Sequence, residues 1–182
     1  MPAQYQRMKA VAVILFLATL TISYAASAEQ ITIVALGASN TQGYGVDVRQ
    51  AFPTRLETLL RQKGYDVRVL NAGVPGDRTG DMLSRLDDWV PKGTKLVLLQ
   101  EGTNDARYGV STEKREANVQ EITTRLAARG AKILLVDRIV GGQAVPKQYM
   151  QADNVHYKVE GHALIANKLL RPVMGALGAP SE

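Results

Sequence analysis

The sequence predicts a three-layer α/β domain in which a short parallel sheet of about four strands carries helices on both faces. Two observations predict this class. Apolar segments of strand length alternate along the chain with segments whose apolar residues recur every three or four positions. Each strand segment is also a nearly continuous apolar run, which is typical of parallel strands that are buried on both faces.

The first half of the chain beyond residue 30 contains three expected strands and two expected helices. Residues 31–36 are apolar and largely β-branched, so they predict a buried strand. Apolar residues at helical spacing from Phe52 to Leu60 predict a helix that Gly64 closes. The other elements expected in this half are a strand over 67–70, a short helix over 79–89 and a strand over 95–100.

The second half contains one further strand between two longer helices. Ser111 or Thr112 is expected to cap a helix that Gly130 ends. Residues 132–136 predict the fourth strand, and the last helix is expected to begin near Val159. The apolar residues that define the inward face of this last helix are Leu164, Ile165, Leu169 and Val173.

The N-terminus has the features of an export signal. Two basic residues precede a run of small and apolar residues over 10–24, and an Ala-Ser-Ala cleavage signal ends at Ala28. A transmembrane anchor is the alternative, but the run is shorter than the ~20 residues that cross a bilayer. We therefore expect a signal peptide over 1–28, a periplasmic or secreted domain over 29–182, and no stable membrane anchor after cleavage.

The composition excludes several classes of function. The chain has no cysteine, which excludes a disulfide scaffold, a thiolate metal site and a cysteine nucleophile. Its formal net charge of +5 falls to +3 without the two basic residues of the signal, and the remaining charges are interspersed, so we expect no nucleic-acid partner. Two histidines without cysteine do not predict a metal site, and no G-x-G-x-x-G or P-loop motif is present. We therefore expect no metal and no cofactor.

Four polar clusters follow the expected strands or precede the last helix. They span residues 37–45, 71–77, 101–105 and 153–156. Because sites in parallel sheets lie at the carboxyl ends of the strands, these clusters are expected near one another. Each cluster taken alone also has a structural explanation. Residues 37–45 could form a glycine-rich turn or a phosphate cradle, and 71–77 a simple turn. Residues 101–105 could form an Asx-turn or helix cap, and 153–156 an N-cap aspartate beside a surface histidine.

The residue types in these clusters fit nucleophilic catalysis. A serine just past a strand and flanked by glycine can expose its hydroxyl at the sheet edge, and an asparagine amide in 101–105 could donate to an oxyanion. Asp153 precedes His156 by three residues, so its carboxylate can bond one ring nitrogen and leave the other free as a base. The other histidine, His162, falls inside the last helix, where we expect a packing or capping role.

Together the four clusters resemble the sequence blocks of the SGNH hydrolase superfamily, the GDSL-type esterases and lipases. The blocks are Gly37-Ala38-Ser39-Asn40, Asn71-Ala72-Gly73, Gly102-Thr103-Asn104-Asp105 and Asp153-Asn154-Val155-His156. The resemblance covers essentially the whole domain and implies a flavodoxin-like sandwich, as in a compact arylesterase-like or acyl-thioesterase-like member. It implies Ser39 as the nucleophile, His156 as the general base and Asp153 as its orienting acid. The oxyanion hole would consist of the Ser39 N–H, the Gly73 N–H and the Asn104 side chain.

Three features depart from the family pattern. Around the nucleophile, Ala38 stands in place of the usual Asp and Asn40 in place of the usual Leu. The Asp normally supports this turn by hydrogen bonding, so its loss leaves the support of the turn open. Tyr157 stands where family members often carry Pro. Only residues 138–152 separate the fourth strand from Asp153, so we expect a compact sheet and a shallow, open acyl site.

The resemblance implies a serine hydrolase that cleaves short-chain acyl or aryl esters of small molecules. The N-terminal signal predicts that it is exported. The sequence does not fix the oligomeric state, and a monomer is favoured. Thioesterase, lysophospholipase or carbohydrate O-deacetylase activity at the same site remains open. So do a non-catalytic binding domain of the same fold and a flavodoxin-like flavin or nucleotide binder. Phe52 and Trp89 lie on inward helix faces and are expected in the core. Four tyrosines fall in loops that could border the cleft and bind an aryl, acyl or sugar group: Tyr44, Tyr108, Tyr149 and Tyr157.

Overall fold

The computed structural model describes residues 30–141 and 145–180, so the expected signal peptide and its cleavage site lie outside the described residues. Four parallel strands form one sheet in the order β2-β1-β3-β4. Their bounds are β1 Ile31–Gly37, β2 Val67–Gly73, β3 Leu96–Leu99 and β4 Lys132–Leu135. The predicted short parallel sheet is therefore confirmed.

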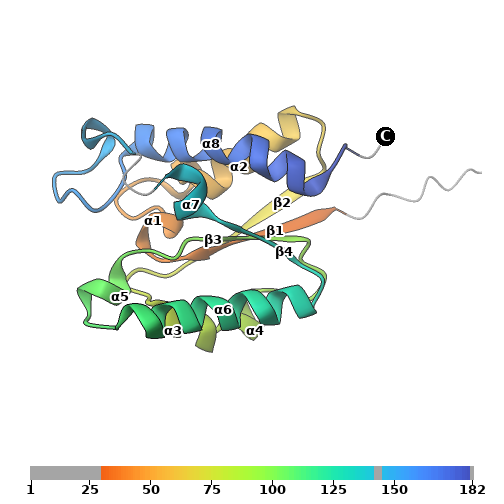
Figure 1. Ribbon diagram of the computed structural model, residues 1–182. Coiled ribbons are helices and arrows are strands. Elements are labelled where there is room, and N and C mark those ends of the chain that lie inside the picture. Colours follow the sequence, from red (N-terminus) through yellow and green to blue (C-terminus); the bar gives the residue numbers. More distant parts are fainter. Residues whose placement is uncertain (1–29, 142–144, 181–182) are drawn as a thin grey trace, which may run out of the picture.

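Helices cover both faces of this sheet (Figure 1). The upper face in the figure carries α2 (Phe52–Gln62), α7 (Val136–Val140) and α8 (Val159–Leu177). The lower face carries α3 (Thr79–Ser84), α4 (Leu86–Trp89) and α6 (Thr112–Ala128). Two short helices, α1 (Ser39–Gln42) and α5 (Asn104–Arg107), lie at the edge of the sheet where the strands end. Two 3-10 turns lie in the loops before α2 and α8, namely η1 (Val48–Gln50) and η2 (Lys147–Tyr149). The three-layer α/β class is confirmed.

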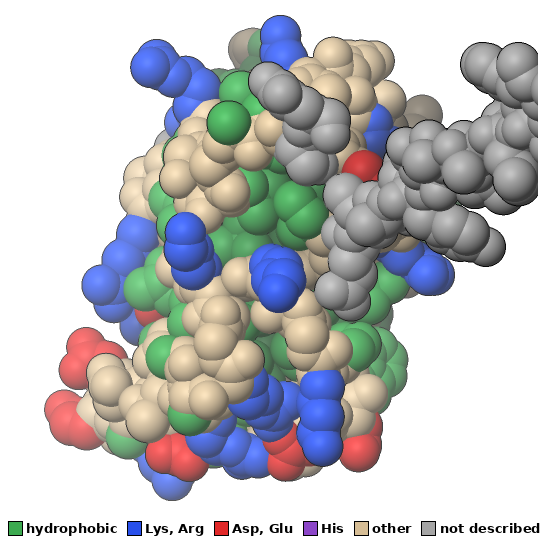
Figure 2. All heavy atoms as spheres, turned by 90° about the vertical axis from the view of Figure 1, so that its right-hand side faces the viewer, with side chains coloured by type: hydrophobic (Ala, Val, Ile, Leu, Met, Phe, Trp, Pro, Cys, Tyr) green, Lys and Arg blue, Asp and Glu red, His purple; other side chains and the backbone are tan. Residues whose placement is uncertain are grey.

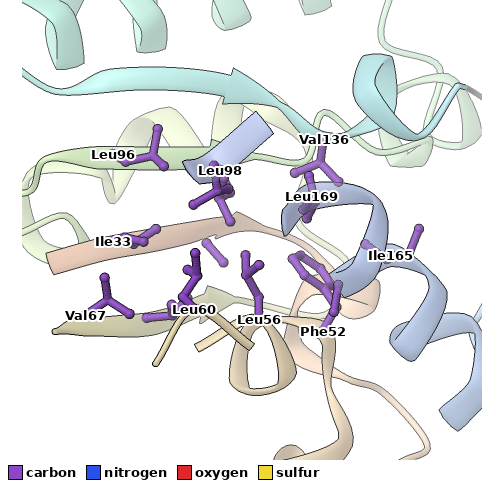
Figure 3. Close-up of a cluster of buried hydrophobic side chains, with 14 of the residues drawn as sticks. Ile33, Phe52, Leu56, Leu60, Val67, Leu96, Leu98, Val136, Ile165 and Leu169 are labelled. Carbon is purple, nitrogen blue, oxygen red and sulfur yellow. The ribbon is translucent and has the colours of Figure 1, made fainter. Parts of the chain in front are cut away.

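Successive side chains of β1 alternate between two hydrophobic clusters, one on each face of the sheet. Ile33 and Ala35 pack with α2 and α8, whereas Val34 and Leu36 pack with α3, α4 and α6. All four side chains are fully buried. Figure 3 shows the first cluster, in which side chains from the strands and from α2 and α8 point toward one another. Burial on both faces explains why this strand reads as a continuous apolar run.

The expected helices form, with one interruption. The Ser111 hydroxyl accepts the Lys114 N–H and caps α6 as predicted. The helix expected over 79–89 is instead broken at Arg85, which ends α3 and precedes α4. Trp89, expected in the core, is 45% exposed, and the Arg85 guanidinium lies 4.7 Å from the centre of its ring. That prediction was wrong because the break interrupts the helical periodicity on which it rested.

The end of the molecule at which the strands begin carries charged side chains of both signs (Figure 2). Lys and Arg side chains are spread over this face, with Asp and Glu side chains among them in its lower part and apolar side chains between them. The basic side chains therefore form no continuous stripe on this face. In residues 30–141 and 145–180, no helix is long and apolar enough to cross a membrane.

Candidate functional site

The polar clusters predicted from the sequence meet at the carboxyl end of the sheet. Ser39 begins α1 directly after β1, and Asn104 begins α5 shortly after β3. Asp153 and His156 lie in the loop that leads into α8, at the same end of the molecule (Figure 1). This placement follows from the parallel topology, because all four strands point toward this edge.

Ser39, His156 and Asp153 form a hydrogen-bonded row. The Nε2 atom of His156 lies 3.0 Å from Ser39 Oγ, and its Nδ1 atom lies 2.6 Å from Asp153 Oδ2. The other carboxylate oxygen accepts the backbone N–H groups of His156 and Val155 at 3.0 and 2.9 Å. These bonds hold the pKa of Asp153 well below its ordinary value, so its carboxylate stays ionised. An ionised Asp153 places the ring proton on Nδ1 and leaves Nε2 free to accept a proton from Ser39.

The turn that presents Ser39 is held without an aspartate. Ala38 is only 6% exposed and packs in the cluster beneath α3, α4 and α6. The backbone closes the turn instead, because Gln42 N–H donates to the Ala38 carbonyl and Gly43 N–H donates to the Ser39 carbonyl, each at 2.9 Å. Gly43 ends α1 in the left-handed conformation, with φ at 92°. In this structure the turn is therefore held by the packing of Ala38 and by backbone hydrogen bonds.

A buried polar chain runs beneath α1. The Thr41 hydroxyl donates to Gln100 Oε1 at 2.6 Å, and both side chains are buried. Nearby, the Oδ2 atom of Asp137 accepts the Gly102 N–H at 2.9 Å. Burial raises the pKa of Asp137, and the bond from Gly102 only partly opposes that shift. The chain joins α1 to the loop between β3 and α5.

The predicted oxyanion donors differ in their availability. The Asn104 Nδ2 group donates to the Asp77 carbonyl at 2.8 Å, which uses one amide hydrogen and leaves the second free. The Gly73 N–H already donates to Asn71 Oδ1 at 3.0 Å, so it has no hydrogen left for an oxyanion in this structure. The Gly76 N–H has no hydrogen-bond partner among the described residues, and Gly76 directly precedes Asp77.

Gly73 is instead required by close packing. A β-carbon at this position would lie 2.2 Å from the backbone nitrogen of Gln42 and 2.8 Å from the Ala38 carbonyl oxygen. No side chain fits there without moving α1. A glycine in the second block is therefore also required by the contact between β2 and the helix that carries Ser39.

His162 has the packing and capping role that the sequence predicts. Its side chain is fully buried, and its Nδ1 atom accepts the Phe52 N–H at 3.3 Å, at the first turn of α2. Its ring stacks on Phe52 at 6.4 Å and meets the ring of Tyr157 edge-on at 5.6 Å. Burial lowers the pKa of His162 to about 4, so the ring is neutral at pH 7.

A cavity of about 810 Å³ lies beside Ser39. Small-molecule sites typically measure ~300–1,000 Å³. Its apolar lining includes Val145, Pro146, Met150, Val155 and Tyr157, and its polar lining includes Gln100, Arg115 and Asp137. The short segment before Asp153 thus supplies one wall of a sizeable cavity.

Two of the four loop tyrosines lie at the site. The Tyr44 ring is 51% exposed, and its centre lies 4.5 Å from the centre of the His156 ring, so it covers one side of the imidazole. Tyr157 lines the cavity, and burial raises its pKa to about 12, which keeps its hydroxyl neutral. Tyr108 is 59% exposed, and neither it nor Tyr149 lines the cavity.

The sequence patterns predict no role for two residues that line this site, Asn40 and Asp137. The signal at Asn40 was its departure from the family's leucine. A single carboxylate after a strand is common, so Asp137 has no distinguishing signal in the sequence. Within the described ranges, no group of three or more His, Asp or Glu side chains could hold a metal ion.

Comparisons with known proteins agree with the four blocks. The family model of the GDSL-like Lipase/Acylhydrolase family matches residues 35–178. The chain is 31% identical to Esterase TesA of Pseudomonas aeruginosa over 106 residues, which are 58% of this chain and 53% of that protein. It is 30% identical to the Arylesterase of Vibrio mimicus over 113 residues, which are 62% of this chain and 56% of that protein.

The chain thus spans about half the length of the curated relatives it matches. The crystal structure of TesA shares the fold, with a TM-score of 0.73 at 22% identity over 80% of this chain and 99% of that chain. Because the family match extends over most of the sequence, the chain belongs to the GDSL-like lipase/acylhydrolase family, within the SGNH hydrolases that its sequence blocks resemble.

Proposed function

We propose that this protein is a serine hydrolase that cleaves carboxylic ester bonds with Ser39, His156 and Asp153. The observation that carries the proposal is the row in which His156 lies 3.0 Å from Ser39 Oγ and 2.6 Å from Asp153 Oδ2. Membership in the GDSL-like family and the names of the two relatives, an esterase and an arylesterase, support it. The adjoining cavity supplies the space that a substrate requires.

The reaction is a two-step acyl transfer. His156 Nε2 takes the hydroxyl proton of Ser39 while Oγ attacks the ester carbonyl carbon, and the ionised Asp153 stabilises the resulting imidazolium. The tetrahedral intermediate then breaks its bond to the alcohol oxygen, which leaves with the proton from His156. Water attacks the acyl-enzyme by the same route, releases the acid and restores the Ser39 hydroxyl.

The oxyanion of each intermediate requires preorganised donors. We assign this role to the N–H of Ser39, the N–H of Gly73 and the free amide hydrogen of Asn104. The Ser39 N–H lies in the first turn of α1, where backbone donors have no partner within the helix. The Gly73 N–H donates to the Asn71 side chain in the structure, and it can serve the oxyanion when that side chain turns away.

The cavity walls support two substrate classes. The apolar wall, which includes Val145, Met150 and Val155, suits a short acyl chain or an aryl group. The polar wall, which includes Gln100, Arg115 and Asp137, favours a sugar ester as the second candidate, because these side chains can bond hydroxyl groups. Thioesters and lysophospholipids are further candidate substrates, since Ser39 and His156 would attack their acyl carbonyl carbon in the same way.

We infer from the N-terminal sequence that the protein acts outside the cytoplasm. The apolar run and the Ala-Ser-Ala motif that ends at Ala28 support export to the periplasm or the medium. We propose that the exported domain acts as a monomer on small-molecule esters, without a nucleic-acid partner or a membrane anchor.

A substrate panel tests the proposal. The purified protein is assayed with p-nitrophenyl esters of increasing acyl length, acyl thioesters, lysophospholipids and acetylated sugars, with Ser39→Ala as the matched control. Labelling of folded protein by a fluorophosphonate, located by mass spectrometry, reports the nucleophile independently of the substrate. Hydrolysis and an adduct on Ser39 are expected. A folded protein without an adduct on Ser39 would instead be a binding domain on this fold.

A further inference from the structure

The Asn40 side chain connects the turn of Ser39 to the segment that carries His156. Its Nδ2 group donates to the Val155 carbonyl at 2.9 Å, and its Oδ1 atom accepts the Tyr157 N–H at 3.1 Å. Both ends of one side-chain amide are therefore bonded to the backbone immediately before and immediately after His156. Since Asn40 directly follows Ser39, its side chain ties the backbone next to Ser39 to the backbone on both sides of His156.

The segment over 153–157 has few other links to α1. The Asp153 carboxylate bonds backbone groups within the segment itself. The His156 carbonyl accepts the Gln151 N–H at 2.7 Å, which is a bond within the same loop. Among the described residues, the hydrogen bonds that join this segment to α1 are the two from Asn40 and the contact between His156 and Ser39 itself.

We infer that Asn40 is a positioning residue that clamps the backbone on both sides of His156 and thereby sets the distance from its ring to Ser39. This inference rests on the proposed function of the site. Asparagine combines a donor and an acceptor on one short planar group. The family's leucine supplies neither, and an aspartate would place a second acceptor against the Val155 carbonyl. The departure at position 40 thus has a structural purpose.

The clamp differs from the contacts that orient the ring. Asp153 bonds Nδ1 and Tyr44 covers one side of the imidazole, so both act on the side chain. Neither links the backbone of His156 to α1. Proton transfer from a hydroxyl to a base requires a heavy-atom distance of about 2.6–3.2 Å, and a misplacement of about 1 Å can lower a rate on the order of 10²-fold. A residue that fixes this distance affects turnover more than substrate binding.

Kinetics of three variants test the clamp on p-nitrophenyl acetate. Asn40→Ala and Asn40→Leu are expected to lower kcat by about 10- to 10²-fold and to leave KM unchanged. The matched control is Asn167→Ala, which removes an exposed asparagine of α8 that donates to the Ala163 carbonyl at 2.8 Å, and which should keep wild-type kcat. Wild-type kcat in the Asn40 variants would overturn the inference. So would a raised KM at unchanged kcat, which would make Asn40 a substrate-binding residue.

A third substitution at position 40 covers the case in which Asn40→Ala and Asn40→Leu do not fold. Asn40→Asp is nearly isosteric and keeps an acceptor for the Tyr157 N–H, but its carboxylate cannot donate to the Val155 carbonyl. It is also expected to lower kcat without raising KM. Wild-type kcat in this variant would show that the donated bond has no part in positioning His156.

Proton NMR gives a readout that needs no substrate. The short bond between Nδ1 of His156 and Asp153 predicts a downfield proton resonance, which is assigned by its loss in Asp153→Ala. Exchange of this proton with water should be several-fold faster in Asn40→Ala than in wild type or Asn167→Ala, because the segment opens more often without the clamp. Equal exchange rates would overturn the inference. If wild-type protein hydrolysed no ester and formed no adduct on Ser39, the proposed function would fail while this measurement still tested the clamp.

Discussion

The amide nitrogen of Asn104 lies 2.8 Å from the carbonyl oxygen of Asp77, which joins the loop after β3 to the loop after β2. Asp77 is itself anchored, because its carboxylate pairs with Arg85 at 2.6 Å. The same guanidinium donates to the Ala72 and Gly37 carbonyls at 2.9 and 3.1 Å, at the ends of β2 and β1. The plane of the Asn104 amide is therefore held before any oxyanion forms, which is the condition for electrostatic preorganisation.

Asn104→Ala should lower kcat on the order of 10²–10³-fold with little change in KM, because the lost donor acts on charge that develops in the transition state. Steady-state kinetics on an aryl ester measure this, with Asn167→Ala as a surface control. Near-normal kcat in the variant would remove Asn104 from the oxyanion hole.

Ser39→Ala should abolish turnover and leave the free energy of unfolding almost unchanged. The substitution removes one hydroxyl from a partly exposed turn, and such changes are usually within about ±0.5 kcal/mol. Hydrolysis of p-nitrophenyl acetate and urea unfolding measure the two effects. Wild-type hydrolysis by the variant would identify a different nucleophile.

Asp153→Asn should lower kcat on the order of 10⁴-fold while the loop keeps its shape. The amide oxygen can still accept the N–H groups of Val155 and His156, but its NH₂ group opposite Nδ1 favours the wrong tautomer of the imidazole. The matched control is Asp47→Asn, which changes an exposed carboxylate that caps η1. Equal kcat in wild type and Asp153→Asn would exclude Asp153 as the orienting acid.

The sheet and the position of the site could be predicted from sequence because both depend on local patterns. Residues such as Ile33 and Val34 are buried on opposite faces of β1, and this produces the continuous apolar run that marks a parallel strand. Parallel topology then places Ser39 and His156 at one edge, although 117 residues separate them.

The remaining features depend on contacts between distant loops, which no local pattern encodes. The hydrogen bond from the Gly73 N–H to Asn71 and the close approach of Gly73 to α1 depend on how this loop turns, and the sequence pattern alone shows neither. Asn40 reaches backbone groups more than a hundred residues away, and its purpose became visible only with the fold. Trp89 was misplaced because a single break at Arg85 changed the face it occupies.

Asp137→Asn should remove a contribution to stability that decreases as the pH rises. Burial raises the folded-state pKa of Asp137 above its unfolded value, so the folded protein binds this proton more tightly. Its contribution therefore favours folding at low pH and is lost as the pH rises from ~3.9 through the raised pKa. The asparagine oxygen can still accept the Gly102 N–H, but it carries no charge to desolvate. Urea unfolding of both proteins measures this: the free energy of unfolding of wild type minus that of the variant should be smaller at pH 7 than at pH 4, and an equal difference at the two pH values would contradict the assignment.

His162→Asn should remove a pH dependence of the opposite sign. Burial lowers the pKa of His162 from 6.5 to about 4, so between these values the unfolded chain binds a proton that the folded protein does not. Its contribution is fully present above pH 6.5 and is lost as the pH falls toward 4, by about 3 kcal/mol at ~1.4 kcal/mol per pKa unit.

The asparagine oxygen can take the place of Nδ1 as acceptor for the Phe52 N–H, but the ring contacts with Phe52 and Tyr157 are lost. The variant should therefore be less stable than wild type at pH 7.5 and should approach it as the pH falls to 4.5. Urea unfolding of both proteins at four pH values across this range gives the difference directly, and the other titrating groups largely cancel because they are common to both. A constant difference across the range would mean that the buried imidazole takes up its proton as readily in the folded protein as in the unfolded chain.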